Sequence, residues 1–178
     1  MTDDALLLKR AQRGDRAAVD AILREHHDTV RAVCHRIVID RDDADDAVQN
    51  ALISIVRALP SFDGRSAFRT WVYRIATNAA LDEVRRIRRR AIPTDDQRTI
   101  DSAERDGTGA VDDRIDIAAA MNGLSEEHRV ALVLRHVADL EYEEIAVILD
   151  VPVGTVRSRL SRAREQLGRA IGNPEPGR

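Results

Sequence analysis

The chain has 178 residues, of which 43% are hydrophobic and 33% charged, and its formal net charge is −3. This composition is ordinary for a folded protein and argues against wholesale disorder, and no apolar run approaches the length of a transmembrane span. A single cysteine, Cys34, excludes an internal disulfide and cannot by itself form a zinc site. We expect no metal and no cofactor. The amino terminus, MTDDALLLKR, lacks the charge order and length of a signal peptide, which predicts a cytoplasmic protein.

Apolar residues recur at spacings of three and four along most of the chain, whereas no segment shows a convincing alternation of period two. The sequence therefore predicts an all-α fold with two small helical domains, each burying a modest core. In chain order, the expected helices are Asp4–Arg13, Arg16–Ile39, Asp43–Leu59, Ser66–Arg90, Arg114–Gly123, Glu126–Ala138, Tyr142–Leu149 and Val153–Ile171.

The stretch between the two predicted domains is acidic. Residues 91–113 hold seven acidic residues against two arginines, together with one proline and two glycines, and they show little apolar periodicity. This composition is typical of a solvated, flexible linker. We therefore expect domains at residues 1–90 and 114–172, an acidic flexible linker at 91–113 and a loose tail at 173–178.

Five aspartates gather around the start of the third expected helix, at positions 40, 42, 43, 45 and 46. The positive end of the helix dipole accounts for one or two of them, and the others are suited to basic groups on a partner. Residues 42–46 also fit the DDxxD pattern with which helical isoprenoid synthases hold magnesium and a diphosphate. That enzyme needs a second carboxylate motif and a larger bundle, and we find neither in the sequence.

Four of the five aromatic residues lie within twelve positions, directly before a basic helix. Aromatic faces stack on the bases of opened nucleic acid, which is worth about 1–3 kcal/mol per base, and arginines hold its backbone by charge. As an alternative, part of the cluster belongs to the core, because Phe68, Trp71 and Ile75 recur at helical spacing. The segment therefore indicates binding to single-stranded nucleic acid, with some of its aromatics buried.

The C-terminal part places four arginines within eight positions, 157–164. At about 100° per residue, one apolar face is shared by Val153, Val156, Leu160, Ala163 and Leu167. Upstream, YEEIAVIL forms a short helix that DVP, residues 150–152, interrupts. A short helix, a tight turn and an amphipathic helix with a polar outer face are typical of the helix-turn-helix, whose second helix enters the major groove of DNA.

Two other interpretations of the arginine-rich helix remain open. It could be a solvated surface helix, against which the accompanying turn argues. It could also belong to a regulator that answers to a ligand or to phosphorylation. The aromatic and basic segment in the first half of the chain argues against that class, because a ligand-binding domain has no need of it.

Two long stretches resemble a known family. GLSEEHRVALVLRHVADLEYEEIAVILDVPVGTVRSRLSRAREQL resembles the fourth conserved region of bacterial extracytoplasmic-function (ECF) sigma factors. RDDADDAVQNALISIVRALPSFDGRSAFRTWVYRIATNAALDEVRRIRRR resembles the second conserved region, in the matching order along the chain. The resemblance implies an alternative sigma factor that binds core RNA polymerase, recognises minus-10 and minus-35 promoter elements and promotes promoter opening without catalysing a reaction.

The resemblance also implies where each partner binds. Minus-35 DNA would contact Thr155, Arg157, Ser158, Ser161 and Arg162. Minus-10 DNA would contact Phe62, Ser66, Phe68, Arg69, Trp71, Arg74 and Asn78, of which Phe62, Ser66 and Asn78 would line the pocket of a flipped base. A coiled coil of the largest polymerase subunit would contact Asp43, Asp45, Asp46, Gln49 and Asn50. An anti-sigma factor is a further expected partner, and no membrane insertion is expected.

Four residues depart from the family pattern. Asp150 replaces the glycine that is usual in the turn, although aspartate tolerates a left-handed backbone. Glu141 stands where a capping serine is common, and Asn50 stands where an acidic residue is usual. Ser161 stands where some relatives carry an aromatic residue, so the base preference of a relative does not transfer to this chain.

Overall fold

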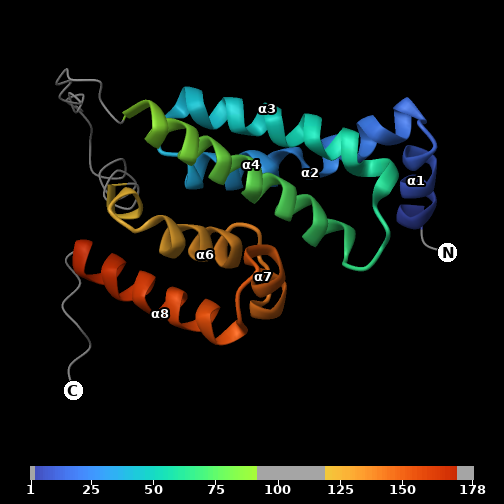
Figure 1. Ribbon diagram of the computed structural model, residues 1–178. Helices are drawn as coiled ribbons and strands as arrows, with labels where there is room; N and C mark the ends of the chain where they lie inside the picture. The colour runs from blue at the N-terminus through green and yellow to red at the C-terminus, as the bar shows by residue number, and fades with distance from the viewer. Residues whose placement is uncertain (1–2, 92–118, 172–178) are drawn as a thin grey trace.

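The computed structural model describes residues 3–91 and 119–171, which form two groups of helices with no strand (Figure 1). The first group contains α1 (Asp3–Gln12), α2 (Arg16–Ile37), α3 (Arg41–Ala58), a 3₁₀ turn η1 (Leu59–Ser61) and α4 (Phe68–Ala91). The second group contains α6 (Glu126–His136), α7 (Tyr142–Leu149) and α8 (Val153–Ala170), preceded by helical residues 119–122. The predicted all-α fold is confirmed. The expected linker beyond residue 91, the first part of the expected helix Arg114–Gly123 and the expected tail at 173–178 lie outside the described residues.

Two helix starts differ from the prediction by two residues. α3 begins at Arg41, earlier than expected, because the side chain of Asp40 caps it by accepting the N–H groups of Asp42 at 2.9 Å and Asp43 at 3.0 Å. α4 begins at Phe68, so the predicted start at Ser66 was wrong by two residues. The backbone carbonyl of residue 67 accepts the first helical N–H, from Trp71, and the serine hydroxyl lies one residue too early to cap the helix.

The core of the first group lies between α2, α3 and α4, which pack on one another. One face of α4 supplies Val72, Ala76, Ala80 and Val84, spaced by four residues and each at most 9% exposed. The thiol of Cys34 on α2 points at this face, with its sulfur 3.8 Å from the carbonyl oxygen of Ala76. Burial raises the pKa of the Cys34 thiol to about 12, so the side chain stays neutral and acts as a small apolar residue.

In the second group, α6 packs against α8 and α7 lies across both. The side chains of Leu134, Ile145, Val156 and Leu160 are at most 1% exposed and join the three helices. α7 ends at Leu149 and is followed by the C-cap residue Asp150, whose backbone is left-handed, with φ 52° and ψ 50°. The expectation that aspartate serves in place of glycine at this turn is confirmed.

The two groups of helices are in contact at two helix–helix interfaces. α4 of the first group packs on α7 of the second, and α2 packs on α6 (Figure 1). The helices of the described residues include none with the length and apolar composition needed to cross a lipid bilayer.

The turn at Asp150 yields a prediction about stability. Substitution Asp150→Val should lower the free energy of unfolding by about 1–2 kcal/mol, because a β-branched residue clashes in the left-handed region. Asp150→Asn is the matched control and should stay within about 0.5 kcal/mol of the parent, because asparagine tolerates the same backbone. Urea unfolding followed by circular dichroism measures both, and a valine variant as stable as the asparagine variant would contradict the assignment.

Candidate nucleic-acid interface

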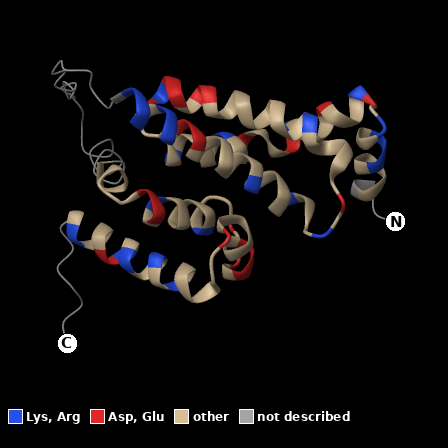
Figure 2. Cartoon of the chain, in the orientation of Figure 1, with Lys and Arg blue, Asp and Glu red and all other residues tan. Residues whose placement is uncertain are grey.

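The helix α8 has one buried and one exposed face. Val156, Leu160 and Ala163 are at most 1% exposed and dock α8 on α6 and α7. Ser158, Ser161 and Arg162 are exposed on the other side of the helix, and Arg157 and Arg164 are exposed beside the buried face. Figure 2 shows basic residues distributed along the helix. Thr155 is half-buried in the first turn, where its carbonyl accepts the Ser158 hydroxyl at 2.9 Å. The helix therefore offers a row of guanidinium and hydroxyl groups of the kind that bind phosphates and base edges.

The arginines of α8 fall into two kinds. Arg159 turns inward, where it pairs with Glu127 of α6 at 3.0 Å and its side chain is 18% exposed. Arg169 pairs with Glu165 on its own helix. Within the described residues, Arg157 and Arg162 have no ion-pair partner, so their charges are available to an external anion.

A second candidate site is a groove of about 790 Å³ between α3 and α4. Its lining includes Asn50, Ser54, Ile75, Asn78, Arg85 and Arg89. The amide of Asn78 and the hydroxyl of Ser54 lie on exposed positions, and the arginines lie two to three turns further along α4. Asp82 and Glu83 also line the groove, and Asp82 pairs with Arg85 at 2.9 Å. The groove therefore suits an extended nucleotide whose base meets the amide of Asn78 and whose phosphates meet the guanidinium of Arg89. Sequence reasoning did not select Ser54, although its spacing of four from Asn50 places both on one face of α3.

The aromatic cluster lies at the other end of α4. The ring of Phe62 is 5.2 Å from the rings of both Phe68 and Trp71, and the last two stack at 5.5 Å. Trp71 is 8% exposed and belongs to the core, as the alternative interpretation expected, whereas Phe68 and Ile75 are only half-buried. Tyr73, which that interpretation did not name, is 4% exposed and is also a core residue. Ser66 is half-buried in the loop before α4.

The structure does not bring Phe62 and Ser66 into the groove that Asn78 lines. Trp71, which contacts Phe62, and Asn78 are seven residues apart on one helix, which corresponds to about 10 Å along its axis. The three residues expected around one base therefore lie at two ends of a longer surface in this structure.

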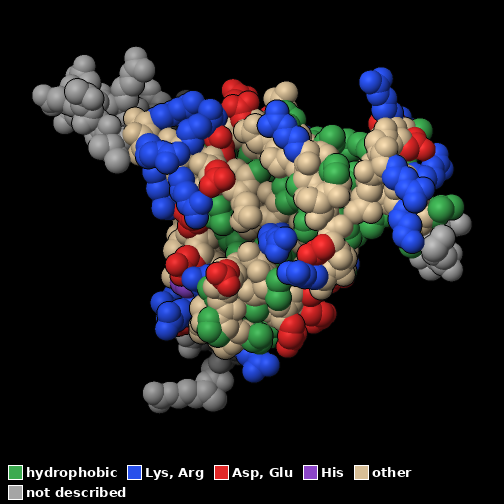
Figure 3. Space-filling model, turned by 45° about the vertical axis from the view of Figure 1, so that its right-hand side comes forward, with side chains coloured by type: hydrophobic (Ala, Val, Ile, Leu, Met, Phe, Trp, Pro, Cys, Tyr) green, Lys and Arg blue, Asp and Glu red, His purple; other side chains and the backbone are tan. Residues whose placement is uncertain are grey.

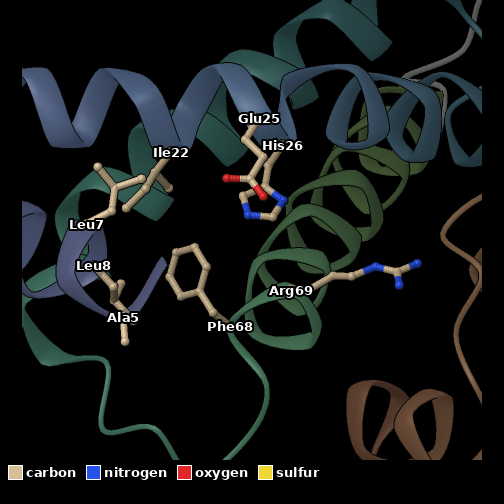
Figure 4. A pocket seen from close by; sticks show the side chains of 8 residues that line it. All are labelled: Ala5, Leu7, Leu8, Ile22, Glu25, His26, Phe68 and Arg69. Atoms are coloured by element: carbon tan, nitrogen blue, oxygen red, sulfur yellow. The ribbon is translucent and has the colours of Figure 1, made fainter. Parts of the chain in front are cut away.

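A smaller pocket of about 320 Å³ opens beside the aromatic cluster, between α1, α2 and the start of α4 (Figure 4). Phe68 points into it toward Leu7 and Leu8, whereas Arg69 turns away toward the second group of helices. The ring of His26 lies 5.6 Å from that of Phe68, and burial lowers the pKa of His26. The walls are largely apolar, which does not suit a phosphate.

The acidic start of α3 faces the basic end of α4, as Figure 2 shows. Arg86 contacts Asp46 at 3.0 Å and Asp43 at 3.5 Å, and its Nε donates to Glu83 at 2.6 Å. Hydrogen bonds to Glu83 and Asp46 raise the pKa of the Arg86 guanidinium above its usual value. Arg90 approaches Asp43 at 3.7 Å. The negative charges of Asp43 and Asp46, which the sequence analysis assigned to contacts with the polymerase, are thus partly neutralised by arginines of the same chain.

The other residues predicted to bind partners are exposed. Asp45, Gln49 and Asn50 are exposed on α3, as is the paired Asp46, although Asp45 also contacts His35 at 2.7 Å. Arg74 is exposed on α4 and has no ion-pair partner among the described residues. Figure 3 shows arginine side chains gathered on the surface where α4 ends.

Comparison with known proteins gives matches along almost the whole chain. Residues 22–90 match the family described as Sigma-70 region 2, and residues 114–167 match the family described as Sigma-70, region 4. The RNA polymerase sigma-H factor of Pseudomonas aeruginosa is 39% identical, with 94% of this chain and 93% of that protein covered. The ECF RNA polymerase sigma-E factor of Escherichia coli K12 is 37% identical, with 94% of each covered.

Two solved structures share the fold. CnrH in complex with the cytosolic domain of CnrY superposes with a TM-score of 0.72 at 23% identity, covering 97% of this chain and 99% of that chain. The sigma factor RpoE of Bartonella quintana, in complex with the anti-sigma factor NepR, superposes with a TM-score of 0.71 at 24% identity, covering 88% and 98%. Both similarities extend over the two groups of helices.

Proposed function

Because the chain belongs to the extracytoplasmic-function group of sigma-70 factors, we propose that it binds core RNA polymerase and directs transcription from promoters with minus-10 and minus-35 elements. Residues 1–90 bind the polymerase and the minus-10 element, and residues 114–172 bind the minus-35 element. Residues 91–113 join them as a linker, and the tail at 173–178 has no assigned role. Two modules on one chain bind cooperatively, because the first contact raises the effective concentration of the second.

The minus-35 element is read by α8 in the major groove. Arg157 and Arg162 are the proposed main contacts, because both are exposed and neither is paired within the described residues. Thr155, Ser158 and Ser161 supply hydroxyl groups beside them. Arg159 is excluded from this role by its ion pair with Glu127.

The minus-10 element is opened along α4. Asn78 and Ser54 receive an unstacked base in the α3–α4 groove, with Arg89 on the phosphates. Arg74 adds charge between the groove and the aromatic end. Phe62, Ser66 and Phe68 border the strand at that end, while Trp71 holds the loop by packing on Phe62.

The polymerase docks on the exposed side of α3, through Asp45, Asp46, Gln49 and Asn50, with Asp43 at the edge. The adjoining exposed side chains of Ile53 and Val56, 41% and 40% exposed, add apolar surface to the same helix. An anti-sigma factor that covers these surfaces is the further proposed partner.

The chain is proposed to act by binding alone, in the cytoplasm. The competing magnesium-dependent enzyme is disfavoured by the surroundings of its DDxxD motif, since Asp43 and Asp46 already contact the guanidinium of Arg86. A bound arginine opposes the gathering of a divalent cation at the same carboxylates.

The observation that carries the proposal is the 39% identity to a sigma factor over 94% of the chain, with both proposed DNA surfaces exposed. Run-off transcription with purified core polymerase and a library of promoters should yield defined start sites only when the protein is added. The absence of new transcripts from the inhibitor-free protein would refute the proposal, because neither an enzyme nor a simple repressor would produce them.

Substitution Arg162→Ala should weaken binding to promoters that carry the preferred base at one minus-35 position, by about 1–3 kcal/mol. Competition binding with each base at that position measures the loss. The matched control is Arg159→Ala, which breaks the ion pair with Glu127 and should leave base preference unchanged. An equal loss for all sequences in Arg162→Ala would show that the residue contacts only phosphate.

Substitution Asn78→Ala should slow promoter opening more than it weakens the closed complex, because its amide is placed to bind an unstacked base. Permanganate footprinting reports opening, and filter binding at low temperature reports the closed complex. Asn122→Ala removes the same exposed group from the second helical group and serves as the control. Normal footprints in the Asn78 variant would remove this residue from the base site.

A further inference from the structure

We propose that Gln12, the last residue of α1, is a positioning residue for minus-10 recognition, which holds the loop between α3 and α4 in the shape that receives the opened strand. The inference rests on the proposed function, because Phe62 and Ser66 of this loop are assigned there to the edge of that strand. It also adds α1 to the promoter-binding part of the chain, although α1 precedes residues 22–90, which match Sigma-70 region 2.

Two hydrogen bonds join half-buried Gln12 to the loop. Its Nε2 group donates to the carbonyl oxygen of Phe62 at 2.8 Å and to that of Leu59 at 3.4 Å. The Leu59 carbonyl also accepts the backbone N–H of Phe62 at 3.2 Å, in the 3₁₀ turn η1. Because a side-chain amide carries two N–H groups, one glutamine serves both carbonyls. The contact therefore ties the end of α1 to a turn 47 to 50 positions further along the chain.

The end of α1 is itself fixed on α2, which gives the amide a defined origin. Arg10 donates from Nε to Oδ2 of Asp15 at 2.8 Å, and Oδ1 of Asp15 accepts the N–H of Ala17 at 3.0 Å and so caps α2. The hydrogen bond from Arg10 lowers the pKa of the Asp15 carboxyl, so the cap stays ionised at neutral pH. Gly14 has a left-handed φ of 87°, and its N–H donates to the carbonyl of Ala11 at 2.9 Å, which ends α1.

The ring and the backbone of Phe62 depend on different supports. The ring lies 5.2 Å from the rings of both Phe68 and Trp71, and Phe68 in turn points into the pocket beside α1 (Figure 4). Burial of these rings is non-directional, so it holds the side chain without orienting the peptide. Hydrogen bonds are directional, and those from Gln12 orient the Phe62 carbonyl and with it the course of the chain toward Ser66.

The loop beyond Phe62 is exposed and its contacts are local. Asp63, Gly64 and Arg65 are exposed, and Gly64 has a left-handed φ of 75°. Arg65 pairs with its near neighbour Asp63 at 3.0 Å, a contact that moves with the loop. The course of the loop is thus set where it leaves η1. Without the amide of Gln12, a smaller fraction of the protein has the loop in the receptive shape.

The test uses Gln12→Met, which keeps the length and helix propensity of the side chain and removes the amide. Holoenzyme is formed from the full chain and core polymerase, and the probe is a forked promoter, identified by run-off transcription, whose minus-10 strand is already single-stranded. The variant should bind this fork with a dissociation constant about three to ten times higher, the effect of losing one net hydrogen bond. Its preference among minus-10 bases should weaken, whereas its affinities for core polymerase and for duplex minus-35 DNA should not change.

Two control variants separate positioning from general stability. Gln166→Met removes an exposed amide that lies 3.0 Å from His128 in the second helical group. Val33→Ala opens a cavity in the core of the first group and lowers its stability. Both controls should keep the base preference of the parent. The same weakening in Val33→Ala as in Gln12→Met would overturn the positioning role, because lost stability would then explain both.

Hydrogen exchange on the free protein tests the contact without polymerase or DNA. The amide proton of Phe62, bonded to the Leu59 carbonyl, should exchange about three to ten times faster in Gln12→Met than in the parent. The protection of core amides in α2 and α4 should not change. An unchanged Phe62 exchange rate would overturn the proposal. If Gln12→Met loses helicity, Gln12→Asn carries the same tests, because its amide is one methylene group too short to reach both carbonyls.

The two proposals fail in different ways. If the parent holoenzyme selects no start site, the proposed function is wrong and the recognition role of Gln12 falls with it, whereas the exchange of Phe62 still decides whether the amide holds the turn. If parent and Gln12→Met direct transcription alike and bind the fork with equal affinity, the function stands and the positioning role is rejected.

Discussion

The packing of α4 constrains everything else in this structure. One face of this helix buries small and branched side chains, from Val72 to Val84, against α2 and α3. A second face meets α7 through Thr70, and a third lines the groove with Asn78. Since a helix of 24 residues has fixed angular positions, any change that rotates α4 within its core moves the DNA surface and the contact with the second group together.

Function in this chain depends on which arginines are already paired. Arg86 and Arg159 are held by carboxylates of neighbouring helices, and each joins two helices of one group. Arg157, Arg162 and Arg74 have no such partner among the described residues. Because an exposed guanidinium loses little hydration when it meets a phosphate, the unpaired arginines are the ones suited to nucleic acid. A negative total charge therefore coexists with local basic surfaces.

The sequence predicts local structure well and contacts between helices poorly. Apolar spacing located α7 to the residue, and the chemistry of aspartate anticipated the left-handed turn at position 150. The resemblance led to the exposed face of α8. Pairs such as Arg86 with Asp46, or Thr70 with Glu144, join residues 40 and 74 positions apart, and no periodicity along one helix reports them. The sequence likewise did not predict that Phe62 lies away from Asn78, because that distance depends on the conformation of the loop before α4.

The buried sulfur on α2 has a consequence for how this protein can be controlled. Because burial among apolar side chains disfavours the thiolate, the only thiol of the chain offers no nucleophile to peroxide, electrophiles or soft metals while the fold is intact. Oxidative signals thus have no reactive thiol to act on while this polypeptide is folded. Thiol-based redox sensing that reaches transcription through it must reside in another molecule, leaving this chain as the responder.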